Sequence, residues 1–290
     1  GIGIMKLTQI PKITYKQRTI LDLIYTHRFL TRIQIQTMLK HKDKKTINMW
    51  LKDLREKEYI NWIYNKDHFA EKTKPAIYYL GINGIRHMQN MDFHPHDELR
   101  KRYREHERSQ GFIDRSLVIA DVCLDLDDKR NGSYYMTTRY YYETEADYRS
   151  EMRYHFLSDN ELIHPDLCIA QSEGDTDDSI GDPDTTVASY LLEIFDPTLP
   201  RYRLRNKLKK YVEYLEEELD EWDEQTGDPR PTFLLVCATL TDLIYAKRRT
   251  RGLMAEIWEY DDEYRPHIRF TTVEMLREYG LLAETIWEKT

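Results

Sequence analysis

Two acidic residues interrupt apolar segments in which a carboxylate is costly. Asp166 lies within IHPDLCIA and Glu193 within SYLLEIF, and each segment otherwise has the pattern of a short buried strand. A carboxylate that is buried without a partner loses its hydration and gains nothing in return, so each must be paired or have a chemical function. We therefore expect Asp166 and Glu193 to act together.

The segments around these two acids predict an alternation of helices and strands. In chain order they are a long helix over 98–127, a strand in SYYMTTRYYYET, strands in LIHPDLCIA and ASYLLEIF, an amphipathic helix in RYRLRNKLKKYVEYLEEELDEW, a buried strand in TFLLVCATL and a helix in LIYAKRRTRGLMAEIWEY. The acidic, turn-rich QSEGDTDDSIGDPDTTVAS between the two acidic strands predicts a mobile hairpin tip.

This α-β-β-β-α-β order, with an acid on each of two central strands, resembles that of the PD-(D/E)XK nucleases. The resemblance implies that Asp166, which follows Pro165, and Glu193 bind Mg²⁺ or Mn²⁺. Such a cation polarises the scissile phosphate and helps to form hydroxide at neutral pH. The lysine expected two positions after the second acid is Phe195 in this chain, which departs from the pattern.

Three interpretations of the departure stay open. In the first, the lysine function has moved to the following helix, where Lys207 or Arg203 reaches the site. In the second, the chemistry is lost and the acids persist in a degenerate scaffold. In the third, Asp166 is a cap or turn residue and Glu193 pairs with Arg203 or Arg205. The first makes Asp166, Glu193 and Lys207 the candidate catalytic residues, with Asp166 and Glu193 as metal ligands.

The first 90 residues predict a different domain. TYKQRTILDLIYTH, FLTRIQIQTMLK and TINMWLKDLREKEYI have helical spacing, and Thr31 is a plausible N-cap of the second helix. YINWIYN and PAIYYLG then alternate like the strands of a hairpin. Three helices followed by a hairpin predict a winged helix-turn-helix, which places its third helix in the major groove of duplex DNA.

Basic and polar side chains on the third helix and the wing are the candidate DNA contacts. Lysine and arginine would neutralise phosphates, and Asn48 could read a base edge. The candidates are Lys44, Lys45, Thr46, Asn48, Lys52, Arg55, Lys66, Lys72 and Lys74.

Charge distribution supports a polyanionic partner. Residues 1–90 carry 17 Lys/Arg and 7 Asp/Glu, a net charge of +10, whereas the remainder carries 26 and 44, a net charge of −18. A basic first domain attached to an acidic body is typical of a first domain that meets nucleic acid. A winged helix that binds protein instead is the alternative.

Composition fixes the broad class. With 40% hydrophobic and 32% charged residues and no apolar run of about 18 residues, the chain predicts a globular protein without a membrane span. Cys123, Cys168 and Cys237 are far apart in apolar segments, which indicates buried free thiols in a reducing cytoplasm. We expect a winged helix-turn-helix over 1–90, a linker and helix start over 91–110, and a restriction-endonuclease-like mixed-sheet domain over 111–290.

Nearly the whole chain resembles the replication-relaxation family of plasmid and mobile-element proteins. The resemblance rests on RTILDLIYTHRFLTRIQIQTML, LREKEYINW, YYLGINGIRHM, EHERSQGFIDRSLVIADVCLDL, HPDLCI and LLEIFDPTLPRYRLRNKLKKYVEYL. It implies a role in plasmid replication or DNA relaxation, with a second domain related to the nuclease fold.

The sequence leads to two hypotheses about function. The leading hypothesis is a duplex-DNA-binding protein of replication or transfer whose body is a Mg²⁺- or Mn²⁺-dependent nicking nuclease. The alternative is a non-enzymatic regulator or replication accessory, without a cofactor, in which the body forms a homodimer or recruits replication or transfer proteins.

Overall fold

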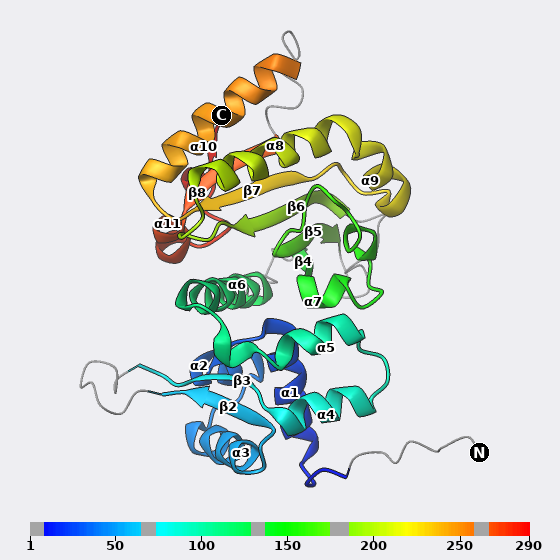
Figure 1. The fold of residues 1–290 in the computed structure, drawn as a ribbon, viewed down its shortest axis with the longest axis vertical. Coiled ribbons are helices and arrows are strands. Elements are labelled where there is room, and N and C mark those ends of the chain that lie inside the picture. Colours follow the sequence, from blue (N-terminus) through cyan, green and yellow to red (C-terminus); the bar gives the residue numbers. More distant parts are fainter. Residues whose placement is uncertain (1–8, 65–73, 129–136, 175–185, 258–266) are drawn as a thin grey trace. The chain divides into compact units, whose positions relative to one another are not determined.

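The chain forms two compact units in a computed structural model that describes residues 9–64, 74–128, 137–174, 186–257 and 267–290. Its internal contacts divide it into Gly1–Asp121 and Val122–Thr290, within one helix (Figure 1). The boundaries expected from sequence, after residues 90 and 110, remain a prediction. Each unit is described by itself below.

The first unit begins with three helices and a small antiparallel sheet of strand order β1-β3-β2 (Figure 1). Its elements are α1 (Tyr15–His27), β1 (Leu30–Thr31), α2 (Arg32–Met38), α3 (Lys44–Glu56), β2 (Ile60–Ile63), β3 (Ile77–Leu80), α4 (Ile82–Asn90), α5 (His96–Arg102), a 3-10 turn (Glu105–Glu107) and the start of α6 (Gln110–Asp128). This order of helices, strand and hairpin is that of a winged helix, as the sequence predicts.

Local signals in the sequence fix where these helices begin. Thr14 and Thr31 each form a capping box with the glutamine three residues later, which confirms Thr31 as an N-cap. Asp43 caps α3 by accepting a hydrogen bond from the backbone N–H of Lys45. The apolar face of α3 is buried as its spacing predicts, through Ile47, Leu51 and Leu54.

The single helix expected over 98–127 is wrong, because the chain breaks between α5 and α6. The break contains Glu105, whose buried carboxylate accepts hydrogen bonds from the guanidinium groups of Arg28 and Arg108. Ser109 then accepts a hydrogen bond from the N–H of Phe112 and starts α6 as a new helix. The interactions of buried Glu105 with two arginines therefore stabilise the break relative to a continuous helix.

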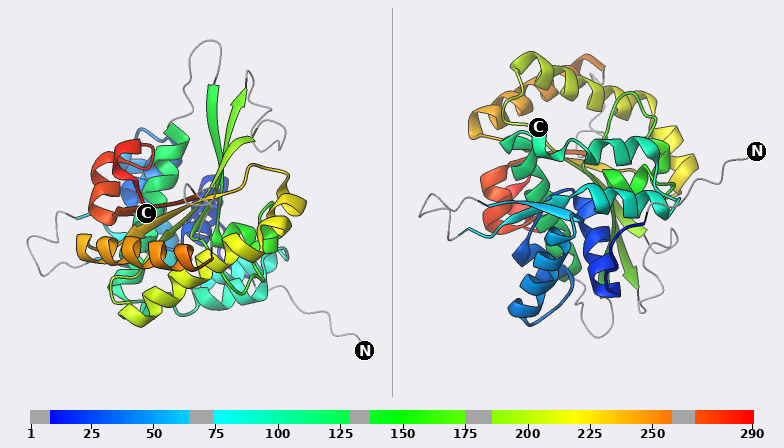
Figure 2. Two further views of the ribbon diagram at one scale, coloured as in Figure 1. Left: turned by 90° about the horizontal axis from the view of Figure 1, so that it is seen from above. Right: turned by 60° about the horizontal axis from the view of Figure 1, so that its bottom comes forward.

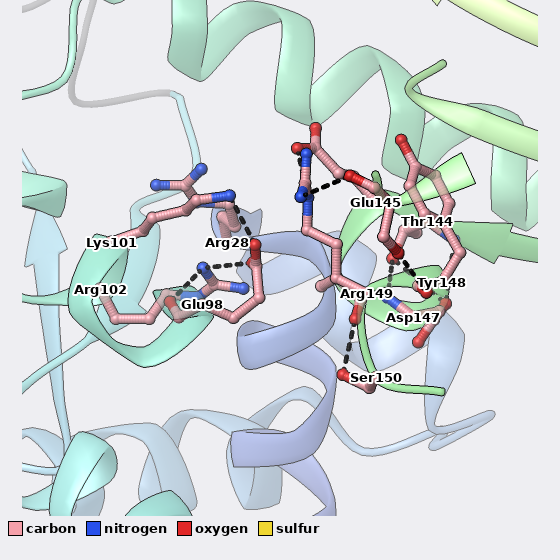
Figure 3. A network of polar contacts seen from close by, with 12 residues as sticks. Arg28, Glu98, Lys101, Arg102, Thr144, Glu145, Asp147, Tyr148, Arg149 and Ser150 are labelled. Carbon is pink, nitrogen blue, oxygen red and sulfur yellow. Dashed lines mark hydrogen bonds and ion pairs between the residues drawn. The ribbon is translucent and has the colours of Figure 1, made fainter. Parts of the chain in front are cut away.

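A second ion cluster lies in α5. Arg102 is almost fully buried and donates hydrogen bonds to the carboxylate of Glu98 and to the carbonyl oxygen of Tyr25. Figure 3 shows Glu98 between Arg102 and Lys101. The hydrogen bond to Tyr25 ties α5 to α1, so the segment after the wing packs onto the winged helix.

The second unit is built on a mixed six-stranded sheet with strand order β4-β5-β6-β7-β8-β9 (Figure 1). Its elements after α6 are β4 (Thr137–Thr144), α7 (Glu145–Tyr148), a 3-10 turn (His155–Leu157), β5 (Leu167–Gly174), β6 (Thr186–Ile194), α8 (Arg201–Glu217), α9 (Leu219–Thr226), β7 (Thr232–Cys237), α10 (Leu240–Ile257), β8 (Ile268–Thr272), α11 (Val273–Tyr279), a 3-10 turn (Glu284–Ile286) and β9 (Glu288–Lys289).

The pairing between neighbouring strands changes from antiparallel to parallel at β6, in the middle of this sheet. The pairs β4–β5 and β5–β6 are antiparallel, whereas β6–β7 and β7–β8 are parallel, with α8 and α9 joining the first parallel pair and α10 the second. The short strand β9 closes the edge in the antiparallel direction. The fold class expected from sequence, a winged helix followed by a mixed α and β domain, is confirmed.

Helices α8 and α10 lie side by side and cover one face of the sheet (Figure 2). The core beneath them includes Leu191, Phe233 and Phe270 from three strands. On the other face, the hydroxyl of Tyr142 donates a 3.0 Å hydrogen bond to Asp127 at the end of α6. The alternation of side chains along β6 therefore decides which residues meet α8.

Three further expectations can be compared with the structure. Cys123, Cys168 and Cys237 are buried free thiols, as expected, and burial raises the pKa of each. Of the stretch 171–189 expected to form a hairpin tip, residues 171–174 and 186–189 belong instead to β5 and β6, and residues 175–185 lie outside the described residues. Within the described part of the chain, no helix is both long and apolar enough to cross a membrane.

Candidate functional site

A basic groove lies over the exposed side of α3. Lys44, Asn48 and Lys52 follow one another at four-residue spacing and point away from the buried face of the helix. Together with Arg55 and Lys74 they line a cavity of about 420 Å³ between α3 and the hairpin. The structure therefore gathers five of the nine candidate DNA contacts on one concave surface.

Of the other four candidates, the structure describes two, and neither lines the groove. Thr46 donates a 2.6 Å hydrogen bond to the carboxylate of Asp43, so its hydroxyl is part of the α3 cap. Lys45 is exposed at the same end of α3 but does not line the groove. Lys66 and Lys72 lie outside the described residues.

Arg32 also lines the groove, and reasoning from sequence missed it. It is the first residue of α2, and its guanidinium donates a 2.7 Å hydrogen bond to Gln36 one turn later. Lys40 and Lys42 line an adjoining hollow together with Arg32 and Lys44. The signal was present in the sequence as basic residues at both ends of α2, the helix that precedes α3.

Arg55 is held in place by an aromatic ring. Its guanidinium carbon lies 3.6 Å from the centroid of the Trp62 ring, which stacks in turn on Tyr64. Such a contact orients the guanidinium without neutralising it. The groove thus has a preorganised arginine at the base of the wing.

The two carboxylates of the second unit lie opposite one another on adjacent strands. The register pairs Leu167 with Leu192, and one further step places Asp166 opposite Glu193. The backbone N–H of Asp166 donates to the carbonyl oxygen of Leu192, and its carboxylate accepts from the N–H of Ile194, both at 2.8 Å. Opposite residues of an antiparallel pair share a face of the sheet, so both acids face α8.

Glu193 has two partners on α8. One carboxylate oxygen accepts a 3.1 Å hydrogen bond from the ammonium group of Lys207, and the other accepts a 3.0 Å bond from the hydroxyl of Tyr211. The side chain of Glu193 is 7% exposed and that of Lys207 is 42% exposed, so the ion pair lies at the edge of the core. Burial and the adjacent Glu193 carboxylate raise the pKa of Tyr211, which keeps its hydroxyl protonated.

The arginine partners expected for Glu193 are wrong. Arg203 packs its guanidinium against the neighbouring Tyr202 ring, and Arg205 is exposed on α8. Lys207 takes the place that either arginine was expected to fill. Lys207 thus reaches Glu193, as the first of the three interpretations requires, but the same contact would serve a purely structural ion pair.

Phe195 explains why no lysine stands two positions after Glu193. Its side chain is 4% exposed and belongs to the apolar cluster that also contains Leu204 and Cys237. An ammonium group there would have to give up its hydration inside that cluster. The cation of the site therefore comes from the rim of α8.

His164 stands near the two acids and was missed from sequence. Burial lowers the pKa of His164; Arg149 lowers it further, while Glu145 and Glu193 raise it. Arg149 is itself bound to Glu145 on α7, as Figure 3 shows. A pKa lowered below its usual 6.5 leaves the imidazole of His164 neutral at neutral pH, and in that form it can accept a proton.

Asp166 and Glu193 fit a divalent cation in donor type. Mg²⁺ is usually held by one or two carboxylates together with water and substrate phosphates, and a carboxylate that accepts one hydrogen bond per oxygen keeps further lone pairs. Among the described residues there is no cluster of three or more His, Cys, Asp or Glu side chains that could enclose a metal by themselves. Any cation here would need water or a bound phosphate to complete its coordination.

The fold and site define a class: a winged-helix unit with a basic groove, joined to a mixed-sheet unit with paired carboxylates. The family description "Replication-relaxation" matches residues 21–228, and the chain belongs to that family. No curated protein matches it.

Solved structures of the MarR family resemble part of the chain. A mutant of Escherichia coli MarR complexed with operator DNA is 16% identical over 31% of this chain and 70% of that chain, with a TM-score of 0.22. ZitR of Lactococcus lactis, a zinc-responsive MarR family member, is 19% identical over 44% and 83%, with a TM-score of 0.24. Scores this low do not define the fold, which rests on the element order and strand register given above.

Proposed function

We propose that this chain is a duplex-DNA-binding protein of plasmid or mobile-element replication that docks α3 in the major groove. The observation that carries the proposal is the groove over α3, where Arg32, Lys44, Lys52 and Lys74 surround Asn48. A winged helix places this same helix against base edges. Membership of the replication-relaxation family supports the link to replication.

The groove residues divide into two roles. The lysines and Arg32 neutralise phosphates on either side of the groove, which supplies affinity without sequence preference. Asn48 is exposed in the middle of this row and has the amide that pairs bidentately with adenine. Arg55, held over Trp62, either contacts a phosphate or reads guanine at the edge of the wing.

Fluorescence anisotropy of the full chain with labelled duplexes tests the proposal. We expect salt-dependent binding that Lys52→Gln weakens, and an Asn48→Ala variant that loses sequence preference while it keeps non-specific affinity. Lys16→Gln is the matched control, because Lys16 is exposed on α1 and does not line the groove. An absence of binding even at low salt would contradict the proposal and favour a winged helix that binds protein.

A second candidate function is metal-dependent cleavage of one DNA strand at Asp166 and Glu193. It is supported by the position of Lys207, which brings a cation to Glu193 in place of the lysine missing at Phe195. Asp166 and Glu193 would hold Mg²⁺ or Mn²⁺, which would polarise the phosphate and lower the pKa of a bound water. Lys207 would stabilise charge that develops on the phosphate, and Tyr211 orients Glu193.

Nicking of supercoiled plasmid in Mg²⁺ or Mn²⁺ tests this second function. We expect Glu193→Gln and Lys207→Met to abolish nicking, whereas Arg205→Gln, an exposed change on the same helix, leaves it intact. If wild type binds its cognate duplex and never nicks it, the body is a non-enzymatic scaffold that dimerises or recruits replication proteins. The proposal of DNA binding would survive that outcome.

A further inference from the structure

The second unit contains a cavity of about 560 Å³ on the face of the sheet that does not meet α8. The register pairs Leu234 of β7 with Arg269 of β8, and their neighbours Phe233 and Ile268 belong to the core under α8 and α10. Since side chains alternate along a strand, Arg269 lies on the opposite face from that core. The cavity therefore has its own lining, away from Glu193 and Lys207.

Arg269 is a cation that has no acidic partner among the described residues. It lines the cavity, is half-buried, and donates a 3.2 Å hydrogen bond to the carbonyl oxygen of Ile268. Among the described residues no carboxylate lies within ion-pair distance of its guanidinium, although Glu284 lines the same cavity. Burial lowers the pKa of Arg269, which shows that its charge is partly desolvated.

A second cation stands directly across from it. Lys289 of β9 pairs with Arg269 in the antiparallel register, and it also lines the cavity. Like charges that lie opposite one another on neighbouring strands are destabilising. The acid of β9, Glu288, lies on the other face, where it accepts a 3.1 Å hydrogen bond from Lys247. An anion placed between Arg269 and Lys289 would relieve their repulsion.

The rest of the cavity favours an aromatic group. Tyr140, Tyr190 and Trp287 contribute rings to its lining, and Gln171 contributes an amide whose oxygen accepts a 3.3 Å bond from the hydroxyl of Tyr190. No described residue accepts a hydrogen bond from the amide nitrogen of Gln171, so its two donors can serve a ligand. The volume lies in the range of pockets that bind small molecules, roughly 300–1,000 Å³.

We propose that this cavity binds a nucleoside phosphate, with the phosphate between Arg269 and Lys289 and the base against the aromatic rings. The ligand is either a free nucleotide or the phosphorylated 5′ end of a DNA strand, which present the same chemistry. The inference is independent of the groove over α3 and goes beyond the proposed function.

Isothermal titration calorimetry on the full chain tests it with AMP, inorganic phosphate, adenosine and a 5′-phosphorylated oligonucleotide. We expect AMP to bind more tightly than either phosphate or adenosine alone, because it uses both parts of the cavity. Arg269→Gln and Lys289→Gln should each weaken AMP binding by about tenfold or more. Tighter binding of the oligonucleotide than of AMP, lost in the same variants, would assign the site to a DNA end.

Lys247→Gln is the matched control, since Lys247 contacts β9 from the other face of the sheet and should leave AMP affinity unchanged. Lys289→Glu gives a second readout: it should raise the melting temperature of the protein without ligand, because opposite charges would then face each other, and abolish AMP binding. Lys289 is exposed, so its variants should fold even if Arg269→Gln does not. Absence of AMP binding at millimolar concentration, or unchanged affinity in the Lys289 variants, would overturn the proposal.

Discussion

The groove over α3 predicts how DNA affinity depends on salt. Four cations line it: Arg32, Lys44, Lys52 and Lys74. Among the residues that the structure describes, none of them has a carboxylate partner inside the groove, and their one contact with an acid is that of Lys52 with the exposed Glu56, at 3.8 Å. If each neutralises one phosphate, the slope of log K against log salt concentration is about −3.6, at about −0.9 per contact. Arg55 is left out of this estimate because its guanidinium packs on Trp62.

Removing one of these cations should change the slope by a fixed amount. Lys44→Gln should reduce the slope to about −2.7. If the variant and the wild type have equal affinity at 1 M salt, the variant should bind about eightfold more weakly than the wild type at 0.1 M salt. Asn48→Ala should leave the slope unchanged and cost about 1–3 kcal/mol only on the preferred sequence. Lys16→Gln, outside the groove, should change neither quantity.

Anisotropy titrations of wild type and the three variants between 50 and 300 mM salt measure these slopes on one duplex. The reasoning is refuted if Lys44→Gln keeps the wild-type slope, because the groove would then not be where phosphates lie. It is refuted equally if Lys16→Gln lowers the slope as much as Lys44→Gln does, since binding would then follow net charge alone.

Three further predictions concern stability. Tyr211→Phe removes a hydrogen bond to a buried carboxylate and should lower the free energy of unfolding of the second unit by about 1.5–3 kcal/mol, measured by urea unfolding; no change would mean that the carboxylate is hydrated instead. His27 has a pKa lowered to about 4 by burial, so the unfolded state binds the proton first as pH falls from about 6.5 to 4. Stability should therefore be lost across that window, by up to roughly 3 kcal/mol, and His27→Leu should remove this part of the pH dependence and leave the part that comes from His94, whose pKa burial also lowers to about 4. Gly84→Ala would place a Cβ 2.3 Å from the carbonyl oxygen of Tyr59 and should unfold the first unit, seen by circular dichroism, whereas Gly252→Ala meets open space and should be neutral or slightly stabilising.

Local patterns were sufficient for the winged helix. Capping signals at Thr31 and the apolar spacing of α3 depend on neighbours within one or two turns, and both were read correctly from sequence. The same spacing places Lys44, Asn48 and Lys52 on the exposed side of the helix. Arg32 was missed because its membership of the groove depends on how α2 packs against α3, which periodicity does not specify.

Long-range pairing explains what the sequence did not reveal, in the first unit as well as in the second. The break before α6 depends on Glu105 meeting Arg28, which lies 77 residues earlier in the chain. The cavity of Arg269 depends on β9 returning to pair with β8, and two residues of strand carry almost no sequence signal. In both places the sequence shows a charged residue, but the residue that lies opposite it follows from the fold and cannot be found from neighbouring positions.

The choice of Lys207 over Arg203 follows from the geometry of α8. Both residues lie on the helix face that carries Tyr211, since 203, 207 and 211 are one turn apart, so face alone cannot separate them. Arg203 lies in the first turn of α8 and packs its guanidinium over the ring of Tyr202, whereas Lys207, one turn later, forms the ion pair with Glu193. Because Lys207 keeps 42% of its side chain in solvent, it can swing from Glu193 to a phosphate without leaving a cation buried. A structural ion pair and a displaced catalytic lysine thus require the same position on the helix, and only the nicking assay with Lys207→Met distinguishes them.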